Sequence, residues 1–118
     1  MAHVLDYIEF AVDDLEQSKA FYAKALGWAF NEYGPDYAGI KDPSHPDREF
    51  GGLSPHSPPS RGEGVLALIR TDDADTALAS VLAAGGRVQV AMHDYPGGRR
   101  FMFADPSGNI LGVYEPSE

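Results

Sequence analysis

The side chains best placed to do chemistry are a glutamate and a tyrosine two positions apart, Glu9 and Tyr7, in the segment VLDYIEFAV. Apolar residues alternate with other types along this segment, which predicts a β-strand with Ile8 and Phe10 on one face and Tyr7 and Glu9 on the other. A carboxylate beside a phenol can give a proton to a bound molecule or take one from it. The pair is therefore a candidate acid–base site.

A carboxylate on the inner face of a strand is costly to bury without a partner. We expect Arg70 or Arg100 to neutralise Glu9, or Glu9 to keep a proton. The sequence has no cysteine, which excludes a disulfide, a thiolate nucleophile and a cysteine-ligated zinc site. Its four histidines fall at a terminus or in loops rich in Pro, Ser or Asp, which favours solvated imidazoles. They are His3, His45, His56 and His93.

Nine basic and 18 acidic side chains give a formal charge of -9. That sign disfavours a protein that binds nucleic acid by neutralising phosphates, and it equally disfavours docking on an anionic membrane. The apolar stretches are far shorter than the roughly 20 residues that span a bilayer, and the first 20 residues do not resemble a signal peptide. We therefore expect a soluble, cytoplasmic protein with neither nucleic acid nor membrane as a partner.

The two halves of the chain repeat one another at an offset of 59 residues. Asp13 and Asp14 align with Asp72 and Asp73, and Gly27 aligns with Gly86. Each copy predicts a strand, then a helix that begins at an aspartate cap (Asp13 or Asp72) and ends at glycine. We expect strands near 4–12, 28–33, 37–41 and 49–54 in the first copy, and near 65–70, 87–91, 99–104 and 109–115 in the second.

Each half is thus predicted to be a βαβββ unit, which makes the chain an α+β protein with a pseudo-two-fold repeat. We expect one domain over residues 1–118, with unit one at about 1–56 and unit two at about 63–118. The Pro-rich stretch 54–64 joins them, because proline cannot donate to a central ladder. The helix covers one sheet face of each unit, so the other face must meet the second unit or a partner chain.

Three segments carry a family resemblance: FAVDDLEQSKAFYAKALGW at 10–28, TDDADTALASVLAAGGRV at 71–88 and FADPSGNILGVYEP at 103–116. They resemble the vicinal-oxygen-chelate superfamily, which contains glyoxalase I, extradiol dioxygenases, fosfomycin-modifying enzymes and bleomycin-binding proteins. The resemblance implies that the two units form a curved sheet around a cleft. It also implies a homodimer, often with clefts shared between subunits.

The resemblance further locates a metal site, with one ligand on the first strand and one on the last strand of each unit. Those positions fall on Tyr7, Leu66, Gly112 and Leu53 here. Leucine and glycine side chains offer no donor atom, and a neutral phenol is a poor ligand. We therefore expect no metal and no other cofactor. A displaced site built from Glu9 and one of the histidines is the alternative.

Without a metal ion, the cleft is expected to be a mostly apolar pocket for a small molecule. The expected lining follows from strand alternation and the family positions, and it comprises Tyr7, Glu9, Leu53, Leu66, Leu68, Arg70, Arg100, Met102, Gly112 and Tyr114. Phe101, Phe103 and Trp28 are predicted to belong to the core.

Three functions remain open from the sequence. The first is a binding protein for an apolar, planar or cationic small molecule, because a net negative charge attracts cations. The second is a metal-independent enzyme in which Glu9 and Tyr7 transfer protons. The third is a lyase or dioxygenase with a divalent metal on displaced ligands.

Overall fold

The protein is seen here in a computed structural model that describes residues 2–59, 61 and 64–117. Residues 8–54 form β1 (Ile8–Ala11), α1 (Leu15–Leu26), β2 (Phe30–Glu32), β3 (Ala38–Asp42) and β4 (His45–Ser54). Residues 67–116 form β5 (Ala67–Arg70), α2 (Ala74–Ala83), β6 (Arg87–Tyr95), β7 (Gly98–Ala104) and β8 (Ile110–Pro116). Each half is a βαβββ unit, as the repeat predicts.

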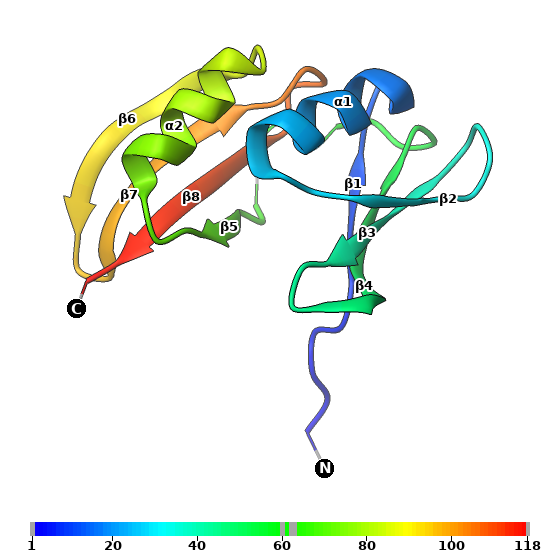
Figure 1. The fold of residues 1–118 in the computed structure, drawn as a ribbon, viewed down its shortest axis with the longest axis horizontal. Helices are drawn as coiled ribbons and strands as arrows, with labels where there is room; N and C mark the ends of the chain where they lie inside the picture. Colours follow the sequence, from blue (N-terminus) through cyan, green and yellow to red (C-terminus); the bar gives the residue numbers. More distant parts are fainter. Residues whose placement is uncertain (1, 60, 62–63, 118) are drawn as a thin grey trace.

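The two units build sheets of the same topology. The first sheet has the strand order β1-β4-β3-β2, and the second has the order β5-β8-β7-β6. In each sheet the first strand runs parallel to the last strand of its unit, and the other pairs are antiparallel. Figure 1 shows the sheets beside one another, with α1 and α2 packed together on one side. The predicted α+β class and repeat are therefore confirmed.

Both helices begin one residue later than predicted. The caps are Asp14 and Asp73, not Asp13 and Asp72, because the second aspartate of each pair has extended backbone and its carboxylate reaches forward. Asp14 accepts a hydrogen bond from the Gln17 amide at 3.0 Å, and Asp73 accepts one from the Thr76 amide at 3.1 Å. Gly27 ends α1 in the left-handed conformation, at φ 72°.

One hydrophobic core lies between the helices and both sheets. Trp28 is 6% exposed and stacks on Tyr22 with the ring centroids 4.8 Å apart. Phe101 and Phe103 are fully buried in the same cluster, so the three core predictions are confirmed. The core also contains Phe10, Val12, Leu15, Phe21, Ala25, Ala38, Ile40, Leu53, Val81, Leu111 and Val113.

The turn that follows β7 ties the two units together. Asp105 is 2% exposed and accepts hydrogen bonds from the Tyr22 hydroxyl at 2.7 Å and from the amides of Ser107 and Asn109. The Asn109 side chain donates a hydrogen bond at 2.6 Å to the carbonyl of Ala11, the last residue of β1. Burial and the neighbouring Asp105 charge raise the pKa of Tyr22 well above its usual value. The turn therefore holds α1 and β1 against the second sheet.

Two strands extend further than predicted. β4 begins at His45 and β6 continues to Tyr95, so His45 and His93 lie in strands and not in loops. β6 and β7 form an antiparallel pair from Arg87, which lies opposite Ala104, to Tyr95, which lies opposite Gly98. A short turn joins the two strands at that end. Gly98 has a φ of 143°, and a β-carbon there would collide with the backbone oxygen of Glu115. No helix among the described residues is long and apolar enough to cross a membrane.

Candidate functional site

Each sheet packs one face on the core and leaves the other face open. In the first sheet, strand register aligns Glu9 with Gly52, Gly52 with Gly39, and Gly39 with Asn31. This row crosses all four strands on the open face, because its strand neighbours Phe10, Leu53 and Ile40 point into the core. We refer to the side of the sheet that bears this row as the first open face.

The two glycines in the row leave space directly above the backbone for polar side chains. A β-carbon at Gly39 would overlap the carboxylate of Glu49, and one at Gly52 would overlap the hydroxyl of Tyr37. Tyr7 also approaches Gly52, with its hydroxyl 2.9 Å from where that β-carbon would lie. The absence of side chains at positions 39 and 52 therefore lets these groups lie flat on the backbone and meet.

Five residues on the first open face form a phenol–carboxylate cluster, composed of Tyr7, Asn31, Tyr33, Tyr37 and Glu49. The Tyr7 and Tyr37 hydroxyls are 2.6 Å apart, and Tyr7 donates to Glu49 Oε1 at 3.2 Å. Glu49 Oε2 accepts from the Tyr33 hydroxyl at 2.6 Å and from Asn31 Nδ2 at 2.9 Å. Glu49 is thus fixed by three neutral donors.

The hydrogen bonds set the charge state of the cluster. Those from Tyr33 and Asn31 lower the pKa of the Glu49 carboxyl below its usual value near 4.5, so Glu49 is ionised at neutral pH. Burial chiefly raises the pKa of the Tyr7 phenol, although its hydrogen bond to Tyr37 acts in the opposite direction. Burial and the contacts with Tyr7 and Glu9 raise the pKa of Tyr37 far above its usual range. Both phenols therefore keep their protons.

Glu9 lies on the same open face as this cluster. Its negative charge is one of the causes that raise the pKa of Tyr37. The expected neutralisation by Arg70 or Arg100 is wrong for this chain, since neither arginine makes an ion pair with Glu9 in the part of the chain described here. The reason is that both arginines belong to the second sheet and Glu9 is exposed, so water can solvate its charge.

The second sheet presents a different open face. Register aligns Leu68 with Gly112, Gly112 with Met102, and Met102 with Val90, so the row that corresponds to Glu9, Gly52, Gly39 and Asn31 is apolar. Leu68 is 41% exposed and Val90 is 38% exposed. Leu66, which is half-buried, precedes β5 two residues before Leu68. We refer to this side of the second sheet as the second open face.

A basic row runs beside the apolar one. It consists of Arg70, Tyr114, Arg100 and His93, which are aligned in register across β5, β8, β7 and β6. The Arg100 guanidinium lies 4.5 Å from the centroid of the Tyr95 ring. Its Nε is buried and has no hydrogen-bond acceptor among the described residues. The second open face therefore combines cationic groups with exposed hydrocarbon.

One expected cleft residue lies elsewhere. Leu53 is fully buried and pairs with Phe10 on the core side of the first sheet. The pairs Glu9–Gly52 and Leu68–Gly112 show why, because Leu68 follows Glu9 by 59 residues but Gly112 follows Gly52 by 60. A slip of one residue moves a strand side chain to the opposite face. The position that corresponds to Gly112 is therefore Gly52.

The remaining expected lining residues divide between the two faces. Tyr7 and Glu9 lie together on the first, and Leu68, Arg70, Arg100, Met102, Gly112 and Tyr114 lie on the second. A cavity of about 210 Å³ lies between the sheets, lined mainly by apolar residues of β1, β5 and β8 together with Glu9. Glu9 is therefore the one ionisable residue among those that line this cavity.

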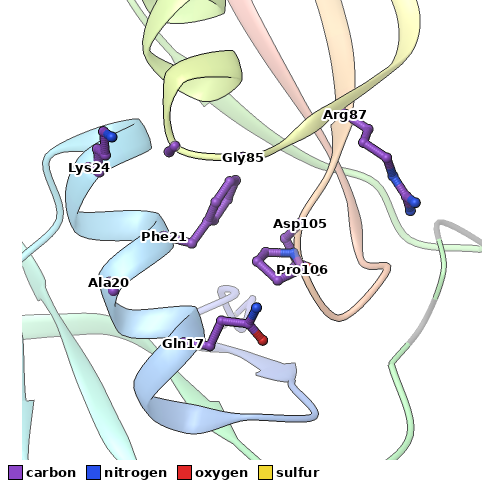
Figure 2. Close-up of a pocket in the computed structure, with 9 residues that line it drawn as sticks. Gln17, Ala20, Phe21, Lys24, Gly85, Arg87, Asp105 and Pro106 are labelled. Atoms are coloured by element: carbon purple, nitrogen blue, oxygen red, sulfur yellow. The ribbon is translucent and has the colours of Figure 1, made fainter.

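A larger hollow of about 440 Å³ lies on the helix side of the molecule (Figure 2). Phe21 and Pro106 lie in its centre, while Lys24 and Arg87 stand on opposite sides of it. Phe21 is only 3% exposed, and the cations do not converge on one point. The open sheet faces and the cavity beside Glu9 are therefore the better candidates for a ligand site.

The family metal site does not fit the residues of this chain. Leu66 and Gly112 offer no donor atom, and Tyr7 is a protonated phenol held in the cluster. No group of three or more His, Asp or Glu side chains within the described ranges could hold a metal ion. The proposed combination of Glu9 with a histidine therefore has no geometric support in this chain.

Sequence reasoning missed four members of the cluster: Asn31, Tyr33, Tyr37 and Glu49. The strands that position them were predicted, but their pairing was not. Two signals pointed to them, namely the glycines at 39 and 52 within strands and the unusual density of tyrosine near residue 35. Glycine within a strand often marks a close approach by another group, as it does here.

The paired βαβββ units define a class of α+β proteins built from two related four-stranded sheets. Comparison with known sequences agrees, because the profile of the Glyoxalase/Bleomycin resistance protein/Dioxygenase superfamily matches residues 4–113. The chain belongs to this superfamily. No curated protein is significantly similar to it in sequence.

Solved structures share the fold over nearly the whole chain. TnmS3, an antibiotic binding protein from Streptomyces sp. CB03234, is 30% identical with a TM-score of 0.71, and the match covers 99% of this chain and 98% of TnmS3. A glyoxalase/bleomycin resistance protein from the same Streptomyces strain is 27% identical, with a TM-score of 0.65 and coverage of 92% and 96%. A family enzyme from Burkholderia phytofirmans PsJN is 19% identical, with a TM-score of 0.80 and coverage of 98% and 100%, and it shows the fold alone.

Proposed function

We propose that this protein binds a small apolar, planar or cationic molecule on its open sheet faces without a metal ion. The row that contains Leu68, Met102 and Val90 carries the proposal, because Leu68 and Val90 are exposed and an exposed apolar surface rimmed by polar groups is typical of a ligand or partner site. The similarity to TnmS3, which binds an antibiotic, supports a ligand of this kind. The net charge of -9 favours a cation at long range.

We further propose that the protein acts as a homodimer in which the first open face of one copy covers the second open face of its partner. The first face carries the carboxylates Glu9 and Glu49, and the second carries Arg70 and Arg100. A two-fold axis forms both such contacts at once, and opposite charges favour this pairing over contacts between like faces. Each ligand would then lie between a polar face and an apolar one.

A screen of planar aromatic cations, anions and neutral compounds tests the binding function. A ligand that binds only the folded protein raises its melting temperature in a concentration-dependent manner. We expect Leu68→Ala to weaken the best hit by roughly tenfold, which corresponds to the loss of about 1.4 kcal/mol of apolar contact. Leu82→Ala is the matched control, because Leu82 is an exposed leucine on α2.

Two results would contradict the binding function. One is the absence of saturable stabilisation by any compound class, and the other is equal weakening by the Leu68 and Leu82 variants. Sedimentation or light scattering tests the dimer separately. A protein that keeps the mass of a monomer at micromolar concentration, with ligand present, would exclude the homodimer in which the two open faces cover one another.

A second candidate function is metal-independent acid–base catalysis by Glu9 and Tyr7. The hydrogen bonds that join the Tyr7 hydroxyl to Tyr37 and to Glu49 favour it, because they place groups that can move protons on the same open face as Glu9. Glu9→Gln should then abolish conversion of the bound compound and leave the melting temperature nearly unchanged. Recovery of every bound compound unaltered would argue for binding alone.

A further inference from the structure

Two neighbouring arginines of β7 have opposite surroundings. Arg99 lies on the helix side of the sheet, where its guanidinium pairs with the Asp75 carboxylate of α2 through two contacts of 3.2 Å. Arg100 lies on the second open face, because successive strand residues point to opposite faces. It makes no hydrogen bond or ion pair with any residue that the structure describes. The charge of Arg99 is thus matched within the chain, and that of Arg100 is not.

An aromatic ring holds the Arg100 guanidinium in place. Its central carbon lies 4.5 Å from the centroid of the Tyr95 ring, and that ring in turn lies over Gly97, where a β-carbon would come within 2.9 Å of it. A guanidinium that stacks through its flat face keeps the N–H donors of its edge available. The Nε of Arg100 is buried, but its two Nη nitrogens reach the surface. They are therefore oriented donors without an acceptor in the described chain.

The basic row that contains Arg100 runs against the composition of the chain. Acidic side chains outnumber basic ones by 18 to nine, yet this row includes two arginines and a histidine and no acid. The acids next to the row along β6 and β8 lie on the helix side. Asp94 is the register partner of Arg99, and Glu115 accepts a hydrogen bond from the Ala74 amide of α2. The positive charge of the row is therefore not neutralised on its own face.

Hydrocarbon adjoins the basic row at a fixed spacing. Met102 follows Arg100 by two residues in β7, and Leu68 precedes Arg70 by two residues in β5. Two residues along a strand span about 7 Å. A flat bicyclic ring that lies on the apolar row can therefore place an acidic group attached to it at Arg100.

The net charge of -9 does not decide the charge of the group that binds here. Charges on the protein surface are screened over about 8 Å at physiological ionic strength, so most of the carboxylates act weakly on a ligand at this face. A hydrogen-bonded contact between a guanidinium and a carboxylate acts at much shorter range and is among the strongest polar contacts in proteins. The local basic row therefore outweighs the distant acids.

We propose that the second open face binds planar aromatic carboxylates, with the carboxylate on the Nη donors of Arg100 and the ring on the apolar row that contains Leu68 and Met102. This inference rests on the proposed binding function and deepens it, because it names the charged group that the face accepts. The planar fork of an arginine matches the two oxygens of a carboxylate. In the proposed homodimer, a carboxylate from the first open face of the second copy is a competing source of the same group.

Two matched probes test the selection. 2-Naphthoate and 2-naphthamide share their ring and nearly their size, but only the first is charged. We expect the full-length protein to bind 2-naphthoate at least about tenfold more tightly in a naphthalene fluorescence titration at constant ionic strength. In Arg100→Gln the ratio of the two dissociation constants should fall to about one. Arg100→Lys keeps the charge but loses the planar fork, so its ratio should lie between those of the parent and Arg100→Gln.

Arg99→Gln is the matched control, since it removes the neighbouring arginine on the opposite face and should retain the tenfold ratio. Circular dichroism verifies that each variant is folded. An unchanged ratio in both Arg100 variants would overturn the inference. Binding of 2-naphthoate that weakens as the protein concentration rises would also overturn it, because the row would then hold a carboxylate of the second copy.

The same titrations separate this inference from the binding function. Equal dissociation constants for the two probes in the parent protein would overturn the inference and leave the binding function intact. Failure of both probes, with saturable binding of another compound class, would have the same meaning. Failure of both probes and of every other compound class would overturn the inference and the binding function together.

Discussion

The two open faces are built on the same strand topology but carry opposite chemistry. Where the first sheet has Glu9 beside Gly52, the second has Leu68 beside Gly112. The glycine is common to both, and it leaves room for a neighbouring side chain to lie on the backbone. In the first sheet the phenols of Tyr7 and Tyr37 lie over Gly52. In the second sheet the Leu68 side chain lies over Gly112.

This difference indicates how a repeated fold can acquire a two-sided ligand site. The helices, caps and core maintain the symmetry of the repeat, because both units need them to fold. The open faces are not constrained by the core, so their side chains can diverge. A ligand held between the two kinds of face would meet hydrogen bonds on one side and hydrocarbon on the other.

The largest expected effect is at the connection that holds the two sheets together. Asp105→Ala should destabilise the fold by about 3–5 kcal/mol, because it leaves the Tyr22 hydroxyl and the amides of Ser107 and Asn109 without their buried acceptor. Tyr22→Phe removes one of these bonds and should cost about 1 kcal/mol. Denaturant unfolding measures both, and equal losses for the two variants would contradict the role given to Asp105.

The matched glycines provide the next comparison. Gly52→Ala should cost about 1–3 kcal/mol, because its new methyl group displaces the rigid Tyr37 ring and breaks the cluster. Gly112→Ala should cost less, because it meets the exposed Leu68 side chain, which can rotate away from its position 2.5 Å from the new carbon. Denaturant unfolding ranks the two, and near-ultraviolet circular dichroism should report altered tyrosine packing in the first variant alone.

The helix caps test the symmetry that the units share. Asp14→Ala should lower the unfolding free energy by about 1 kcal/mol, because it removes the acceptor of the Gln17 amide. Asp13→Ala should stay within about 0.5 kcal/mol, since this neighbour contributes its backbone amide to Ser107 and its side chain is exposed. The opposite ranking would restore the cap predicted from sequence.

The smallest expected effect concerns acid pH. Hydrogen bonds lower the pKa of Glu49 in the folded state, so the stability that they contribute is present above pH 4.5 and is lost as the pH falls below that value. Glu49→Gln should flatten this acid limb in a series of melting temperatures. Asp73, whose pKa is also lowered, remains in the variant and should preserve part of the limb. An unchanged limb would show that the cluster does not stabilise ionised Glu49.

Raised phenol pKa values act at the other end of the pH range. The folded state keeps the Tyr7 and Tyr37 protons to higher pH than the unfolded state does, so their contribution is present below pH 10 and declines above it. Tyr22 behaves in the same way within the core. Tyr7→Phe should therefore weaken the alkaline decline without removing it, as melting temperatures above pH 10 would show.

Local patterns in the sequence were sufficient for most of the fold. Alternation identified the strands, paired aspartates and glycines delimited the helices, and the 59-residue repeat gave two βαβββ units. Alternation also placed Tyr7 and Glu9 on the same face, because a strand has a period of two residues. These features depend on residue types and their positions along the chain, so they can be read without knowledge of the pairing.

The register between strands could not be read in this way. A constant offset placed Leu53 on the open face, but one additional residue in the second unit shifts the equivalent position to Gly52. The cluster of Tyr7, Tyr37 and Glu49 likewise depends on β1, β3 and β4 meeting side by side. Strand pairing there brings residues 30 or more apart in sequence close enough for their side chains to form hydrogen bonds.

The amino-acid sequence by itself determined the repeat, the class of fold and the donor-poor residues at the family's metal positions, because each is a property of residue types and their spacing along the chain. The tertiary structure decided which glutamate the phenols hold, which glycines lie beneath them and which leucine belongs to the core. Those outcomes depend on strand register, in which a shift of one residue exchanges the two faces of a sheet.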